Sequence, residues 1–160
     1  MNNLLYPAII YELADWLTAD WYFMLLKSPF GPDIATQQFV ADIVADEVTA
    51  PGYSRVLVTG KAITTSSVTP WGQYIQDDPN FGSPTGGQVA TYLALYRKVT
   101  NDADSVVAGV WEVGLNLDGS AQVVKFLQQI GYALNDANPV QAWLLTGEVQ
   151  HLALLSNQQS

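Results

Sequence analysis

The apolar residues of this chain gather in short runs, and no run carries the stripe of a long helix. The clearest run covers residues 21–28, where both alternating faces hold aromatic or aliphatic side chains before a cluster of Pro and Gly stops it. This pattern predicts a central strand buried on both sides. Residues 89–99 and 106–117 are two more β-rich runs, and the Asn and Asp residues between them predict a hairpin turn.

A turn and two further strands are predicted between residues 51 and 68. Pro51 presets φ for a turn and Gly52 accepts a positive φ. The alternating residues 55–61 then predict a strand, which the Thr, Ser and Val residues of 63–68 continue.

A long loop and a second hairpin complete this part of the pattern. Residues 69–88 contain three Pro and four Gly, a composition that predicts the longest loop of the chain. Further on, Asp118-Gly119 lies between apolar segments, which predicts a tight hairpin turn and a strand over residues 121–127.

The ends of the chain and one acidic segment have less regular patterns. Apolar residues recur at helical spacing in residues 1–20, which predicts an N-terminal arm or short helix. Residues 33–50 fit either a short amphipathic helix or an irregular acidic segment. Residues 131–160 hold too much Leu, Val and Trp for a free tail, so we expect them to pack on the core or a neighbouring subunit. The expected core is then residues 21–130.

Short strands with turn signals about every ten residues predict a mainly all-β fold. We expect an antiparallel β-sandwich or jelly-roll-like barrel with short helical or irregular segments and extended terminal arms. A length of 160 residues suits one domain that needs no metal or disulfide to fold.

Composition and charge exclude several classes of protein. Hydrophobic residues make up 49% and charged residues 13% of the chain, which excludes a disordered protein. The net charge of −9 opposes binding to nucleic acid, and the absence of Cys excludes disulfides and thiolate chemistry. The opening residues lack a basic signal-peptide region and the longest apolar run is far too short for a membrane span, so neither secretion nor insertion is expected. So few charges also favour an assembly over a free monomer.

Candidate catalytic groups are few. The single histidine, His151, allows no histidine metal cluster, and no G-x-S-x-G elbow presents a nucleophile for it. Carboxylate pairs occur at 46/47, 77/78 and 102/104, and a glycosidase needs two such groups. The Asp-rich segments 77–80 and 101–104 fit turns better than a calcium site, because they lack the remaining EF-hand spacing. No phosphate-binding glycine motif occurs, and we expect no cofactor.

Three aromatic residues stand out within the predicted long loop. Trp71, Tyr74 and Phe81 lie where a binding platform would be built. Aromatic residues on a loop contact protein partners or stack on sugars, and we prefer the protein partner.

The order of segments resembles a family. A strand reading DWYFMLLKSPFGPD, a segment reading QQFVADIVADEVTAPGYSRVLVTG, and then GGQVATYLALYRKV and SVVAGVWEV are similar to tailed-bacteriophage virion structural proteins. The matching pattern covers roughly residues 15–127. The resemblance implies a non-enzymatic β-sandwich that assembles on a virion and is made in the host cytoplasm. It places Glu47, Gly52, Tyr53 and Arg55 at a structural corner.

The resemblance also implies partners and a location. A capsid cement or decoration subunit would bind the major capsid protein or other virion proteins and its own copies, as a trimer or another homo-oligomer, without contacting nucleic acid or membrane. A tail, baseplate or fibre component is the alternative, and a carbohydrate-binding module or a glycosidase is less favoured. At the corner we expect Arg55 to pair with Glu47, and Tyr53 to cover the edge of the core.

Overall fold

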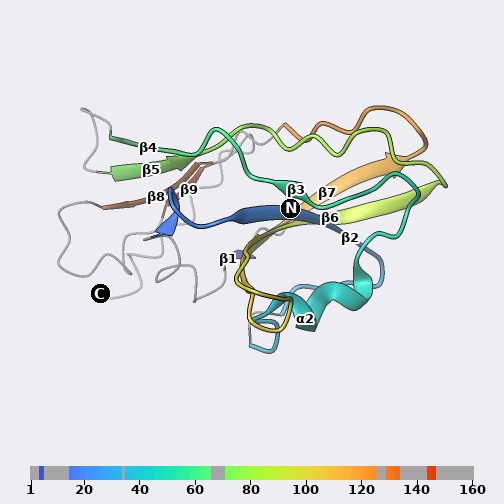
Figure 1. The fold of residues 1–160 in the computed structure, drawn as a ribbon, viewed down its shortest axis with the longest axis horizontal. Coiled ribbons are helices and arrows are strands. Elements are labelled where there is room, and N and C mark those ends of the chain that lie inside the picture. Colours follow the sequence, from blue (N-terminus) through green and yellow to red (C-terminus); the bar gives the residue numbers. More distant parts are fainter. Residues whose placement is uncertain are drawn as a thin grey trace. The chain divides into compact units, whose positions relative to one another are not determined.

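The computed structural model describes residues 4–5, 15–33, 35–65, 71–125, 129–133 and 144–146. The prediction of a mainly β fold is confirmed, since these residues form nine strands and very little helix. Within the described residues the strands make two antiparallel sheets, and neither sheet closes into a barrel (Figure 1).

The chain divides differently from the predicted single core. One compact unit contains residues 1–58 and 79–124, and a second contains residues 59–78 and 125–160. The expected core of residues 21–130 therefore spans parts of both units. The reason lies in strand pairing, because the strands of residues 62–75 pair with each other and with a strand that follows residue 128.

Five strands form the sheet of the first unit. Their order is β1 (Leu4–Leu5), β7 (Val106–Leu117), β6 (Gln88–Arg97), β2 (Trp21–Lys27) and β3 (Val56–Leu57), with every neighbour antiparallel (Figure 1). The predicted central strand is confirmed, because β2 has a partner on each edge and its side chains are buried or half-buried. The predicted hairpin between residues 89–99 and 106–117 is also confirmed as β6 and β7.

A short helical segment covers one face of this sheet. Residues 33–50 were predicted to form either a short amphipathic helix or an irregular acidic segment, and the structure shows a short helix. It is α2 (Val40–Ile43), followed by the 3-10 turn η2 (Val44–Asp46). The Asp42 carboxylate starts α2 by accepting the backbone N–H groups of Gln38 and Phe39.

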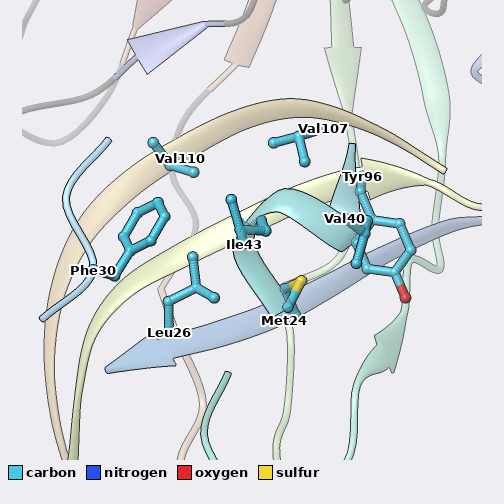
Figure 2. Close-up of a cluster of buried hydrophobic side chains, with 9 residues drawn as sticks. Met24, Leu26, Phe30, Val40, Ile43, Tyr96, Val107 and Val110 are labelled. Atoms are coloured by element: carbon cyan, nitrogen blue, oxygen red, sulfur yellow. The ribbon is translucent and has the colours of Figure 1, made fainter. Parts of the chain in front are cut away.

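Apolar side chains from α2 and the strands form a buried cluster on this face. Val40 and Ile43 of α2 point toward Met24 and Leu26 of β2, and side chains from β6 and β7 complete the packing (Figure 2). The full set is Met24, Leu26, Phe30, Val40, Ile43, Ala94, Tyr96, Val107 and Val110. Burial of these side chains gives the four-residue helix a stability that its length alone could not supply.

Three further side chains of β2 are also buried. Trp21, Phe23 and Leu25 are fully buried, and the ring of Trp16 lies 5.1 Å from that of Trp21. Most of the predicted N-terminal arm lies outside the described residues. Its last part, residues 15–19, forms one turn in which the Asp15 carbonyl accepts the N–H groups of Thr18 and Ala19.

The second unit holds a four-stranded sheet. Its order is β4 (Ala62–Thr65), β5 (Trp71–Ile75), β8 (Gln129–Ala133) and β9 (Leu144–Thr146). The prediction of a loop throughout residues 69–88 is wrong at 71–75, because pairing with β4 and β8 outweighs the local effect of one Gly. Within the C-terminal residues, β9 pairs with β8, and the expected packing of residues 131–160 on the core or a neighbouring subunit stays a prediction.

Two further strand predictions are wrong. The predicted strand over residues 55–61 is a strand only at Val56–Leu57. The Asp118-Gly119 turn does not open a hairpin, because the Gly119 N–H donates to Pro84 and the chain passes to the 79–84 loop. Residues 121–125 contain only a single bridge, between Val123 and Asn80.

Candidate functional site: the Arg55 cluster

The edge of β2 is covered by residues 47–58, which we call the edge segment. At one end the Val48 N–H donates to the Leu25 carbonyl, and at the other the Val58 N–H donates to the Trp21 carbonyl. Between these ends only β3 pairs with β2 as a strand. Residues 49–55 bulge away from the sheet, since the Pro51-Gly52 turn, with a Gly52 φ of +82°, redirects the chain.

The phenol of Tyr53 fills the gap that this bulge leaves. Its oxygen accepts the backbone N–H of Leu25 at 3.0 Å and its O–H donates to Glu47 Oε1 at 3.0 Å. The ring stacks on Phe81 with a centroid distance of 6.0 Å. Burial is the main reason that the pKa of Tyr53 lies far above its usual range. The expected role of Tyr53, to cover the edge of the core, agrees with these contacts.

Arg55 binds two carboxylates from segments far apart in the sequence. Its Nε and Nη2 donate to Glu47 at 2.8 and 2.7 Å, which confirms the predicted pair. Its Nη1 and Nη2 donate to Asp102, in the β6–β7 turn, at 2.7 and 2.9 Å. Both contacts are bidentate, the geometry in which a planar guanidinium binds carboxylates most strongly.

Tyr96 of β6 completes the group, which we call the Arg55 cluster: Glu47, Tyr53, Arg55, Tyr96 and Asp102. Arg55 Nη1 donates to the Tyr96 oxygen at 3.2 Å, and the guanidinium carbon lies 5.4 Å from the Tyr96 ring centroid. The hydrogen bonds to Glu47 and Asp102 raise the pKa of Arg55, and the hydrogen bonds from Arg55 lower the pKa of Asp102. Both shifts favour the charged forms of Arg55 and Asp102.

This arrangement suits a fixed tie rather than catalysis. Every guanidinium nitrogen donates to a carboxylate, and all four carboxylate oxygens accept from Arg55. A general acid or base needs a carboxyl group free to exchange a proton with a substrate, and here the exchange would break a bidentate pair. The cluster ties the edge segment to the β6–β7 turn.

Carboxylates of the other predicted sites accept hydrogen bonds from nearby protein groups. Asp104 accepts the N–H groups of Thr100 and Asn101, and the Asn101 side chain accepts that of Ala103. The turn interpretation of residues 101–104 is thus confirmed. Asp77 accepts the hydroxyl of Thr59 at 3.0 Å. Among the described residues, no three acidic or histidine side chains are grouped to hold a metal ion.

Two of the three predicted loop aromatics lie on a strand rather than on a loop. Phe81 is only 4% exposed and packs on Tyr53, so its part in the predicted contact platform is wrong. Trp71 and Tyr74 belong to β5, and their side chains lie outside the described set. His151 also lies outside the described residues.

Sequence reasoning missed Asp102 and Tyr96 as members of the cluster. Asp102 lies 47 residues from Arg55, in a segment whose composition indicated only a turn. A signal did exist for Tyr96, because a Tyr in a buried strand usually has a hydrogen-bond partner for its hydroxyl group.

The chain matches no protein-family model, no curated protein and no solved structure. None of the helices among the described residues has the length and apolar character that a membrane crossing requires.

Proposed function

We propose that this protein is a non-enzymatic structural subunit of a tailed-bacteriophage virion, and that it acts as a capsid cement or decoration protein. The observation that carries the proposal is the Arg55 cluster. The hydrogen bonds from its guanidinium join the edge segment, β6 and the β6–β7 turn. A subunit of a shell needs such a fixed surface, since rigid partners lose little conformational entropy on assembly.

The similarity of the segment order to virion structural proteins supports the location. The acidic composition agrees with it, because a net charge of −9 keeps the protein away from packaged DNA. A tail, baseplate or fibre position is the alternative within the same class. The finer fold, an antiparallel β-sandwich or jelly-roll-like barrel, is part of the proposal.

Binding to isolated shells tests the proposal. Purified protein is mixed with capsids that lack it and sedimented, and the pellet is analysed for saturable, stoichiometric binding. We expect binding and a higher temperature of shell disruption. Failure to co-sediment with either capsids or tails would overturn the virion proposal.

Labelling on intact particles separates the two locations. Antibody to the protein should decorate the heads under the cement proposal. Decoration of the tail alone would move the protein to the alternative position while leaving its class unchanged.

A further inference from the structure

Three loops meet at the end of the first sheet where β6 begins and β7 ends. They are residues 49–54, 80–87 and 118–122, which we call the neutral loop surface. The Thr85 N–H donates to Pro51 at 2.9 Å, and the Gly119 N–H donates to Pro84 at 2.8 Å. The Gln122 N–H donates to Gly82 at 2.7 Å. These bonds join all three loops within the first unit.

Charge is nearly absent from this surface. Asp118 is the one charged residue within these loops, out of the fifteen acidic and six basic residues in the chain, and its carboxylate already accepts the N–H and O–H of Ser120. At the margin of the surface, Lys27 Nζ donates to the Thr49 hydroxyl at 3.3 Å. Most of the surface consists of exposed Gly, Ser, Thr and Pro, with Val123 at its margin 43% exposed. Elsewhere the described surface carries carboxylates on α2, η2 and several turns.

The uneven distribution of charged residues indicates which partner the neutral loop surface can bind. Two copies of a chain with a net charge of −9 repel each other wherever their carboxylates approach. The neutral loop surface lets them approach closely without burying unpaired charges, and depletion of charge is typical of interface centres. The buried anchors Phe81 and Pro84 and the bonds between the loops hold the surface in shape before contact, which lowers the entropic cost of binding.

We propose that the neutral loop surface is the contact between copies of this chain. The inference rests on the proposed role as an assembling subunit, and it is tested on free protein, so its failure is distinct from a failure to bind shells.

The test is sedimentation velocity at protein concentrations up to about 100 µM. We expect wild-type protein to self-associate more strongly in about 0.5 M than in about 0.05 M NaCl, because salt screens the repulsion between the acidic surfaces. Ser83→Asp should weaken self-association at least about tenfold, since each contact would bury new like charges. Ser83→Ala should leave it unchanged.

Ala45→Asp is the matched control, since Ala45 is exposed on η2 and the variant has the same added charge. It should retain wild-type self-association, and circular dichroism confirms that both Asp variants are folded. Equal weakening by Ala45→Asp and Ser83→Asp would overturn the assignment of the surface. A monomeric wild type at both salt concentrations would also overturn it, and loss of shell binding by Ser83→Asp in that case would assign the surface to a shell protein instead.

Discussion

Replacement of Arg55 by Met should destabilise the first unit more than any other single loss of charge. Met retains most of the aliphatic volume but removes the guanidinium donors of both carboxylates, so that Glu47 keeps only the Tyr53 O–H. Glu47 is 15% exposed and Asp102 38% exposed, so water can replace the guanidinium at Asp102 more readily than at Glu47. Removal of one partner of a buried ion pair lowers the free energy of unfolding by about 3–5 kcal/mol. Because Asp102 is partly exposed, we expect Arg55→Met to lower it by about 3 kcal/mol.

Urea unfolding at pH 7 measures this loss of stability. Lys98→Met is the control, because it removes a positive charge near Asp102 while breaking only a contact of 5.3 Å with the Tyr22 ring. We expect Lys98→Met to lower the free energy of unfolding by no more than about 1 kcal/mol. A double-mutant cycle of Arg55→Met with Asp102→Asn should give a coupling of about 1–2 kcal/mol. Equal costs for the two Met variants would refute the central role of Arg55.

The stability difference between wild type and Arg55→Met should depend on pH. The hydrogen bonds from Arg55 lower the pKa of Asp102 in the folded state. This contribution to stability is therefore complete above the ordinary aspartate pKa of about 4, and it is lost as the pH falls through the lowered folded value. The stability difference between wild type and Arg55→Met should narrow below about pH 4. A constant difference down to about pH 2 would contradict the assigned cause.

Two further substitutions test individual contacts. Tyr53→Phe leaves the Leu25 N–H without its acceptor and should cost about 1–2 kcal/mol in urea unfolding, and no loss would mean that water replaces the phenol. Gly60→Ala should lower the unfolding temperature, because Gly60 has a φ of +62° and an added Cβ would meet the Asp77 carboxyl group. Gly114→Ala is its control and should leave that temperature nearly unchanged, since a Cβ there meets open space.

Prediction of the fold from sequence succeeded where one segment's composition determines its structure. The run at residues 21–28 has two apolar faces, which predicts a strand covered on both faces, and the side chains of β2 are buried or half-buried on both. The limits of β7 agree with the predicted 106–117. The Asp118-Gly119 signal failed because a turn motif determines a local change of direction and carries no information on which strand the chain then joins.

Only the local part of the Arg55 cluster could be predicted from the sequence. Glu47 and Arg55 are eight residues apart, and the Pro51-Gly52 turn between them allowed the pair to be predicted. Asp102 reaches Arg55 only because the β6–β7 hairpin places its turn beside the edge segment. Such a contact depends on the register of whole strands, which no local pattern contains.

The interleaved division of the chain constrains the order in which it folds. β2 is synthesised long before its partner β6, and residues 59–78, which belong to the second unit, must be looped out before the two can pair. Closing such a loop costs entropy before the contacts that stabilise it have formed. We therefore expect slow folding, as in other proteins with high contact order. During synthesis the largely apolar β2 would have only the edge segment to pair with until β6 has emerged. A ribosome-bound chain ending before residue 88 should therefore depend on chaperones, whereas one that extends past residue 124 contains every strand of the first sheet.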